Sequence, residues 1–425
     1  MGQTRKRRTR RHGSGRIRIG VVGLGYWGPN LVRNLVEASA FELACLCDVR
    51  PKVVEAISSR YPAIACTTSF DDVLRDDSID AVVIATPVST HYPLTISALE
   101  AGKHAFVEKP LAVSSDQALE MTRLAEANGL VLMPGHTFVY SPPVKAIKDL
   151  IDTGELGDIY FISSSRVNLG LHQPDVSVVW DLGPHDFSIL RYWLGDVPKQ
   201  VSAVSRSCVF PETPDVAFIS LTYASGTVAH VELSWLSPSK LRRTAIVGSE
   251  KMVIYDDTSN EPVRIFDSGA ELPDPETFGE FRLSYRTGNI VSPRVEAVEP
   301  LSLEFADFGT AILEGRPLAS SPAMGLDVVR TIEAVNRSLA EGGIPVLVDR
   351  GTDVLIEETL QAGIDKRKAS PGSRSHSRAA DDHGTAISPK RPTSAAKAGG
   401  ALRGSRRRPS KRLSGTAPED DASAR

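Results

Sequence analysis

The stretch from Ile17 to Asp48 constrains the fold more than any other part of the chain. It opens with the apolar, β-branched run IRIGVV, which is short enough to be a buried strand. Glycines follow at positions 23, 25 and 28, and the apolar residues after them recur at helical spacing. The glycines therefore occupy a turn between a strand and a helix, which is where a dinucleotide-binding fingerprint must lie to function.

Each glycine has a physical role in such a site. Gly23 allows the tight turn, Gly25 lets the backbone approach a pyrophosphate, and Gly28 lets the helix pack against the strand. A second apolar run ends in Asp48, where a carboxylate can accept hydrogen bonds from the adenosine ribose hydroxyls. Because Asp48 would repel the extra phosphate of NADP, the pattern favours NAD, and Arg50 could partly offset that preference. A glycine-rich turn without a ligand is the alternative interpretation.

Length and cysteine content limit the classes of protein. The 425 residues suffice for two domains with tails, and no run of about 18 apolar residues is present to span a membrane. Cys45 and Cys47 alternate within an expected strand and lack a second pair at metal-site spacing, so we expect small buried side chains. Histidines and cysteines do not cluster, which disfavours a metal site. This cysteine usage fits a cytoplasmic location.

Charge is distributed unevenly along the chain. Residues 1–16 carry seven Lys/Arg and no acid, whereas residues 366–425 carry 15 Lys/Arg and five Asp/Glu. Subtracting these +7 and +10 segments from the net charge of -3 leaves about -20 for residues 17–365. We expect a disordered basic arm and a disordered basic tail, because neither has enough apolar residues to form a core. No aromatic residue lies among the tail's basic residues, so a solubilising tail is favoured over nucleic-acid binding.

The remaining chain divides into two differently patterned parts. From 17 to 138, strands alternate with helices, which predicts an α/β, doubly wound Rossmann domain with a parallel sheet. Its expected strands are 17–22, 41–47, 81–86, 104–107 and 130–133. From 139 to 350, consecutive hairpins predict an α+β domain on an antiparallel sheet, and 351–365 is an uncertain end of the fold. Its expected strands are 159–167, 200–208, 217–223, 227–235, 244–247 and 251–255, and its later helices 187–194, 303–313 and 326–339.

Ligands of a parallel sheet bind beyond the C-terminal ends of its strands. Two loops are expected there, at 85–91 and 107–110. The expected cofactor contacts are Gly23, Gly25, Tyr26, Trp27, Gly28, Asp48, Thr86, Pro87, His91, Glu108 and Lys109.

Four motifs in these loops and beyond carry a family resemblance. GLGYWGPN, ATPVSTH, AGKHAFVEKPLA and WDLGPHD resemble the family of glucose-fructose oxidoreductase and inositol 2-dehydrogenase, often called Gfo/Idh/MocA. The similarity runs from about residue 17 to 348. It implies an open, mostly antiparallel sheet in the second domain, whose free face often joins subunits, and hence a homodimer or homotetramer. It also implies the catalytic trio Lys109, Asp181 and His185.

The trio suits hydride transfer from a secondary alcohol, because such a reaction needs a group that takes the hydroxyl proton. Lys109 follows a sheet strand, and a positively charged nicotinamide and partial burial would favour its neutral form. His185 could exchange the same proton, with Asp181 four residues earlier orienting or charging it. Whether lysine or histidine is the base stays open.

The substrate prediction rests on basic residues and on resemblance. GYWGPNLVRN, GHTFVYSPPV and WDLGPHDFSIL look closest to the nucleotide-sugar 3-dehydrogenase branch, which implies a UDP-N-acetylglucosamine-type substrate oxidised at its C3 hydroxyl. A pyrophosphate needs cationic donors, and the expected ones are Arg166, Asn168, Lys240, Arg242 and Arg243. The alternatives are an inositol or free-sugar dehydrogenase, an NAD-dependent glycosidase of the same fold, and a non-catalytic NAD-binding regulator.

Overall fold

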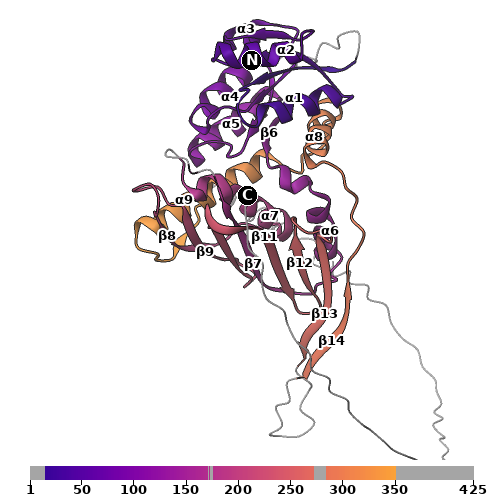
Figure 1. The fold of residues 1–425 in the computed structure, drawn as a ribbon, viewed down its shortest axis with the longest axis vertical. Helices are drawn as coiled ribbons and strands as arrows, with labels where there is room; N and C mark the ends of the chain where they lie inside the picture. The colour runs from indigo at the N-terminus through magenta and orange to yellow at the C-terminus, as the bar shows by residue number, and fades with distance from the viewer. Residues whose placement is uncertain (1–14, 171, 173–175, 272–283, 351–425) are drawn as a thin grey trace, which may run out of the picture. The chain divides into compact units, whose positions relative to one another are not determined.

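The first sheet of the protein is entirely parallel. The computed structural model describes residues 15–170, 172, 176–271 and 284–350. Six strands lie in the order β3-β2-β1-β4-β5-β6 (Figure 1). They are β1 (Ile17–Val22), β2 (Phe41–Cys47), β3 (Ala65–Thr67), β4 (Ala81–Ile84), β5 (His104–Glu108) and β6 (Leu132–Gly135). The strand order reverses between β1 and β4, which is where such a sheet binds its ligand.

Helices cover both faces of this sheet, which is why its apolar strands can be buried on both sides. They are α1 (Gly28–Glu37), α2 (Pro51–Arg60), α3 (Phe70–Arg75), α4 (His91–Glu100) and α5 (Ser115–Asn128), with the 3-10 turn η1 (Val88–Thr90) before α4. One core contains α1 and α8 (Pro300–Glu314), and the other contains α3, α4 and α5. In the first core the ring centroids of Phe305 and Phe106 lie 5.2 Å apart. A helix from late in the chain thus completes the first core.

The second sheet has nine strands in the order β14-β13-β12-β11-β7-β10-β9-β8-β15. They are β7 (Ile159–Leu169), β8 (Gln200–Arg206), β9 (Val216–Thr222), β10 (Val228–Ser234), β11 (Leu236–Gly248), β12 (Met252–Asp256), β13 (Val263–Glu271), β14 (Ser284–Val291) and β15 (Val346–Leu347). Strands β7 and β10 pair in parallel, whereas the other pairs are antiparallel. The fold is therefore a Rossmann domain followed by an α+β domain, as the sequence predicts.

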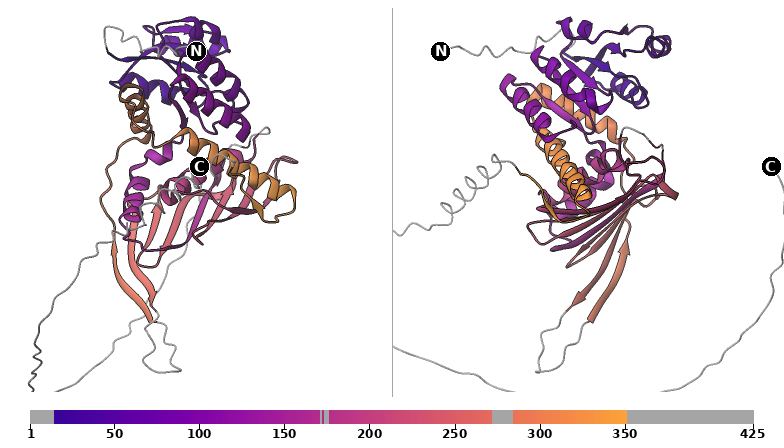
Figure 2. Two further views of the ribbon diagram at one scale, coloured as in Figure 1. Left: turned by 180° about the vertical axis from the view of Figure 1, so that it is seen from behind. Right: turned by 90° about the vertical axis from the view of Figure 1, so that its left-hand side faces the viewer.

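Helices lie on one side of the second sheet (Figure 2). They are α6 (Pro142–Asp152), α7 (Val178–Leu194) and α9 (Pro322–Ala340), preceded by the 3-10 turn η2 (Thr137–Tyr140). Their core includes Val178 and Trp193 of α7 and Ile332 of α9. Side chains of β9 alternate between buried and exposed, because successive residues of a strand point to opposite faces. The other face of the sheet exposes Phe218 of β9 and Val228 of β10.

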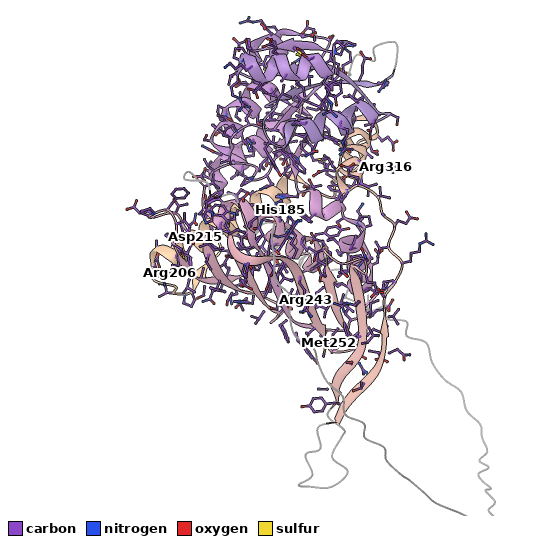
Figure 3. All side chains as sticks on the ribbon, in the orientation of Figure 1. His185, Arg206, Asp215, Arg243, Met252 and Arg316 are labelled. Carbon is purple, nitrogen blue, oxygen red and sulfur yellow. The ribbon has the colours of Figure 1, made fainter. Side chains whose placement is uncertain are left out.

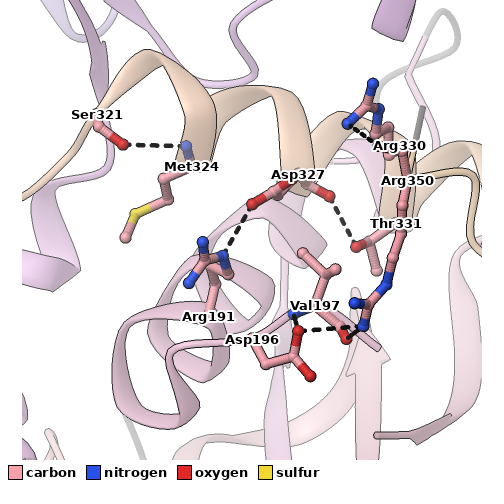
Figure 4. Close-up of polar contacts among 9 residues, drawn as sticks. All are labelled: Arg191, Asp196, Val197, Ser321, Met324, Asp327, Arg330, Thr331 and Arg350. Atoms are coloured by element: carbon pink, nitrogen blue, oxygen red, sulfur yellow. Dashed lines mark hydrogen bonds and ion pairs between the residues drawn. The ribbon is translucent and has the colours of Figure 1, made fainter. Parts of the chain in front are cut away.

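Ion pairs hold α9 against the end of α7 (Figure 4). Arg191 Nε donates to Asp327 Oδ2 at 2.8 Å, and Arg350 Nη2 donates to Asp196 Oδ1 at 3.1 Å. Ser321 caps α9 by accepting a hydrogen bond from the backbone N–H of Met324. These contacts join segments that are distant in sequence and fix the position of α7, which carries two of the expected catalytic residues.

The predicted elements match the observed ones except at a few places. Three features were not predicted from the sequence: β3, the β13–β14 pair and β15. The strand predicted at 244–247 begins at Leu236, and the helix predicted at 187–194 begins at Val178. The WDLGPHD motif is therefore helical, which keeps Asp181 and His185 one turn apart. The predictions for 351–365 and 366–425, and for 1–14 of the basic arm, lie outside the described residues.

None of the helices within residues 15–350 that the structure describes is both long and apolar enough to cross a bilayer.

Candidate active site

The glycine turn after β1 packs as closely as the sequence predicts. Gly23 has φ +94°, in the left-handed region, and a Cβ there would lie 2.4 Å from the carbonyl oxygen of Ala85. A Cβ on Gly28 would lie 2.9 Å from the carbonyl oxygen of Gly23. No side chain caps the N-terminus of α1, which starts at Gly28. The N-terminus of α1 thus lies at the strand-order reversal, beside the exposed Tyr26 and Trp27, where it fits the phosphates of a dinucleotide.

Asp48 is buried at the end of β2, and in the described structure Arg50 already binds it. Asp48 Oδ2 accepts hydrogen bonds from Leu24 N and Arg50 Nη2, both at 2.8 Å, and Oδ1 accepts one from Arg50 Nε at 2.8 Å. These bonds, those from Arg50 above all, lower the pKa of Asp48 to about 2. Arg50 also lies beside the glycine turn, 3.7 Å from the position of a Cβ on Gly25. A ribose would therefore share Asp48 with Arg50.

His91 joins the two loops at the C-terminal ends of β4 and β5. Its Nδ1 lies 2.8 Å from the carbonyl oxygen of Pro110, and its Nε2 lies 2.9 Å from that of Thr86. Burial lowers the pKa of the ring, so His91 is neutral and donates through one nitrogen at a time. Both nitrogens face backbone atoms, so the expected cofactor contact of His91 would act through Thr86, which lies beside Pro87 in the same loop.

Lys109 and Asp181 meet across the two domains. The Lys109 ammonium donates to Asp181 Oδ1 at 3.0 Å and to the Asp181 carbonyl oxygen at 2.8 Å. Asp181 Oδ2 accepts a third bond, from the indole N–H of Trp235 at 3.2 Å. The lysine comes directly after β5, and a cis peptide bond joins it to Pro110. The aspartate lies in the first turn of α7. Asp181 thus holds Lys109 at the C-terminal end of the first sheet.

His185 lies one turn after Asp181 and is neutral. Burial, followed by the charges of Lys109 and Arg166, holds its pKa well below the usual value. Its ring packs edge-on against Phe138, with centroids 4.9 Å apart, and Nδ1 has no partner among the described residues. We expected Asp181 to orient or charge His185, but the structure differs. Asp181 accepts hydrogen bonds from Lys109 and Trp235 instead, because its carboxylate points toward the ends of β5 and β10.

Family models match both parts of the chain. One, described as an oxidoreductase family with an NAD-binding Rossmann fold, matches residues 17–136. The other, the GFO/IDH/MocA C-terminal domain, matches residues 144–254. The chain belongs to the GFO/IDH/MocA oxidoreductase family.

Relatives in this family include enzymes of both cofactor types. The scyllo-inositol 2-dehydrogenase (NAD(+)) of Bacillus subtilis (strain 168) is 29% identical over 279 residues, which are 61% of this chain and 81% of that protein. The scyllo-inositol 2-dehydrogenase (NADP(+)) IolW of the same organism is 24% identical over 349 residues, 76% of this chain and 94% of that protein. The likeness therefore supports a sugar or polyol oxidoreductase without choosing between NAD and NADP.

Solved structures share the fold. GenD2 from gentamicin A biosynthesis, in complex with NAD, is 25% identical with a TM-score of 0.66, and the match covers 79% of this chain and 97% of GenD2. The UDP-N-acetylglucosamine 3-dehydrogenase GnnA from Acidithiobacillus ferrooxidans is 23% identical with a TM-score of 0.65, and the match covers 77% of this chain and 98% of GnnA.

The structure separates the basic residues expected at the substrate end of this GFO/IDH/MocA site. Arg166 and Arg242 are cross-strand neighbours, and their guanidinium carbons lie 4.6 and 5.7 Å from the centroid of the Phe138 ring. Arg243 points to the opposite face of β11 and is exposed on the second sheet (Figure 3). Lys240 is exposed on β11, and Asn168 is partly buried near the end of β7. Arg243 therefore does not join Arg242 in one basic group.

Acidic partners engage both arginines near His185. Arg166 Nε donates to Asp186, and both side chains are buried. Arg242 Nη1 donates to Asp257 Oδ2 at 3.2 Å. Arg166 keeps one enclosed nitrogen, Nη1, without a partner among the described residues. That each arginine has a carboxylate of its own could not be predicted from the sequence.

Sequence reasoning missed two contacts that shape the site. Trp235 binds Asp181, and Phe138 contacts both the His185 ring and the arginines, although neither belongs to the motifs that define the trio. The available signals were that Trp235 ends the expected strand 227–235 and that Phe138 ends the expected first domain. Groups of three or more His, Cys, Asp or Glu able to hold a metal are absent from the described residues. Burial raises the pKa of Cys45 to about 11 and that of Cys47 to about 12, so these thiols stay protonated.

Proposed function

We propose that this protein is a dehydrogenase that moves a hydride between a secondary hydroxyl of a sugar and the nicotinamide of NAD. The observation that carries the proposal is the pair of hydrogen bonds from the Lys109 ammonium to Asp181 at the C-terminal end of β5. The glycine turn and Asp48 fit the dinucleotide, because side chains in place of Gly23 and Gly28 would clash with the carbonyl oxygens of Ala85 and Gly23 and open the tight turn. When bound, the nicotinamide supplies the hydride acceptor.

The chain's own residues would manage the hydroxyl proton. Lys109, once neutral, accepts the proton, and Asp181 holds the ammonium that results. His185 is neutral and has an unpartnered nitrogen, so it can exchange the same proton or orient the hydroxyl. Trp235 fixes Asp181 by donating to its second oxygen. The lysine is the favoured base because its ammonium has a bound counter-ion, whereas neighbouring cations disfavour a charged His185.

NAD is the proposed cofactor in preference to NADP. Asp48 is buried and stays ionised, since its pKa is about 2, and a negative charge there disfavours a phosphate on the ribose. Arg50 reduces this preference by neutralising Asp48 in part.

The proposed substrate is a UDP-N-acetylglucosamine-type sugar oxidised at its C3 hydroxyl. Arg166 and Arg242 support it, because they place two cations beside His185, and the enclosed Nη1 of Arg166 has no partner among the described residues. The runner-up is an inositol or another free sugar, which the inositol dehydrogenase relatives favour. An assembled Lys109–Asp181 pair next to His185 disfavours a non-catalytic regulator. An NAD-dependent glycosidase would differ from the dehydrogenase by releasing free sugar.

A homo-oligomer in the cytoplasm is also proposed. The apolar side chains on the free face of the second sheet, among them Phe161, Val204, Phe218 and Val228, support subunit association through that face.

The test is a screen for NADH formation with UDP-linked sugars, free sugars and inositols, together with titration of the protein with UDP. NAD-coupled oxidation of a UDP-sugar, lost in Lys109→Met, would support both parts of the proposal. Oxidation of inositol without UDP binding would replace the substrate by the runner-up. Release of free sugar without NADH would indicate the glycosidase, and NAD binding without turnover of any sugar would indicate a regulator.

A further inference from the structure

Two glutamates from distant parts of the chain lie behind Lys109. Glu108 is the last residue of β5, and Glu304 belongs to α8, which packs on the Rossmann sheet through Phe305. Glu304 is completely buried, with 0% of its surface exposed. It contacts η2, where the Thr137 hydroxyl donates to Glu304 Oε2 at 2.7 Å. Packing of α8 thus carries a carboxyl group into the interior next to the proposed active site.

Each of these carboxyl groups has one oxygen that is enclosed and unpaired. Glu108 Oε2 accepts a bond from the backbone N–H of Lys109 at 3.3 Å. Oε1 of Glu108 and Oε1 of Glu304 are shielded from solvent and have no hydrogen-bond partner within the part of the chain that the structure describes. An enclosed, ionised oxygen without a donor is costly, whereas a protonated carboxyl group needs fewer donors and becomes one itself.

The surroundings do not neutralise two negative charges. Facing Glu108 are Lys109 and the side chain of Trp27. The charged groups facing Glu304 are Glu108 and Asp307. The Lys109 ammonium is hydrogen-bonded to Asp181 and not to either glutamate.

Nearby His136 adds no cation, because burial and the charge of Lys109 lower its pKa to about 3. Burial also raises the pKa of Glu108 to about 7. It raises that of Glu304 well above the usual range, with the charge of Glu108 adding to the effect. At neutral pH the two glutamates therefore cannot both be ionised.

We propose that Glu304 stays a neutral acid while Glu108 gains or loses a proton with the charge of the bound nicotinamide. The inference rests on the proposed function, which brings the nicotinamide to Lys109. The oxidised ring carries a positive charge that the reduced ring lacks, and a nearby positive charge favours the carboxylate. Binding of NAD+ then releases the proton of Glu108 to solvent, whereas binding of NADH leaves it in place. Glu108 and Glu304 together thus match the charge of the site to the redox state of the cofactor.

Titration calorimetry of the full chain tests this directly. Heats of NAD+ and NADH binding at pH 6.5, measured in two buffers of different ionisation enthalpy, give the number of protons released. We expect roughly three-quarters of a proton for NAD+ and close to none for NADH. The NAD+ dissociation constant should fall about tenfold between pH 6 and 8, while that of NADH stays within about twofold. ADP-ribose, which lacks the nicotinamide, is the ligand control and should release close to none.

Two isosteric variants assign the proton. Glu108→Gln should abolish the proton release, because the amide cannot ionise. Glu304→Gln should keep it, because an amide resembles the neutral acid and can still accept the Thr137 bond. In the infrared spectrum the carbonyl stretch of a protonated carboxyl group should disappear in Glu304→Gln, an observation that needs no turnover.

The outcomes separate this inference from the proposed function. The inference alone would be overturned by any of three results. These are equal numbers of protons released by NAD+ and NADH, unchanged proton release in Glu108→Gln, or as much proton release with ADP-ribose as with NAD+. Loss of release in Glu304→Gln would overturn the assignment of the labile proton to Glu108. Failure of the wild-type protein to bind either dinucleotide would instead contradict the proposed function.

Discussion

Lys109 is the single residue on which the proposed chemistry depends. Replacing it by Met removes the group that takes the proton and leaves the glycine turn untouched. We expect kcat to fall by at least about 100-fold, the size of a general-base contribution, and the NAD dissociation constant to stay within about threefold. Steady-state kinetics and calorimetry measure the two effects. His185→Ala should cost less if that residue only relays the proton. Full activity of Lys109→Met would refute the assignment.

Arg50 is the residue that limits the preference for NAD. It donates two side-chain hydrogen bonds to Asp48, so ribose hydroxyls compete with it. We expect Arg50→Ala to raise the ratio of NAD to NADP affinity by about tenfold, since a charge-assisted bond is worth roughly 1.5 kcal/mol. Binding of both dinucleotides at low salt measures the ratio. Lys52→Ala, on the exposed first turn of α2, removes the same charge and is the control. An equal change in both variants would mean that only net charge matters.

At the scale of elements, the β1–α1 turn depends on Gly23. We expect Gly23→Ala to lower the free energy of unfolding by roughly 2 kcal/mol and to weaken NAD binding, because the methyl group would strike the carbonyl of Ala85. Gly226→Ala is a matched control. Its φ of +91° is nearly that of Gly23, but nothing lies within 4 Å of its Cβ position. Thermal unfolding and calorimetry should show a smaller loss and unchanged binding in the control. Similar losses would assign the effect to backbone strain.

The elements themselves were predictable where the local signal was strong. The strands 17–22 and 41–47 have the predicted bounds, because their apolar runs are local signals. The start of α7 was not predictable. Pro184 and Gly183 discourage a helix in the sequence, yet α7 runs through both, because packing on the second sheet buries them. Tertiary contacts override weak propensity in such segments.

At the scale of the whole molecule, the buried glutamates should make stability depend on pH. The pKa of Glu304 is higher in the folded protein than in the unfolded chain, so the folded state binds more protons above pH 4.5. The free energy of unfolding therefore decreases as pH rises from 5 to 7. We expect Glu304→Gln to reduce that decrease by on the order of 1 to 2 kcal/mol.

Urea unfolding at pH 5 and 7 measures the change. Asp48 does not interfere, because its pKa of about 2 places its titration below this window. The control is Glu314→Gln, an exposed position of the same helix. Identical pH dependence in Glu304→Gln and the wild-type protein would show that Glu304 is ionised.

Deletion of residues 366–425 should leave melting temperature and turnover nearly unchanged. The segment has almost no large apolar residues and contributes little to any core. Scanning calorimetry and the NADH assay on the truncated chain provide the measurement. A large drop in melting temperature would show that the segment docks on the rest of the protein.

The sequence by itself determined the glycine turn, the position of Lys109 after a strand, and the spacing of Asp181 and His185. These features depend on steric and periodic rules that act between near neighbours in the chain. Only the tertiary structure paired Asp181 with Lys109, gave Arg166 and Arg242 their own carboxylates, and put Glu304 behind the site. Such contacts join residues far apart in the sequence, and their geometry follows from how α7 and α8 pack, which local patterns do not encode.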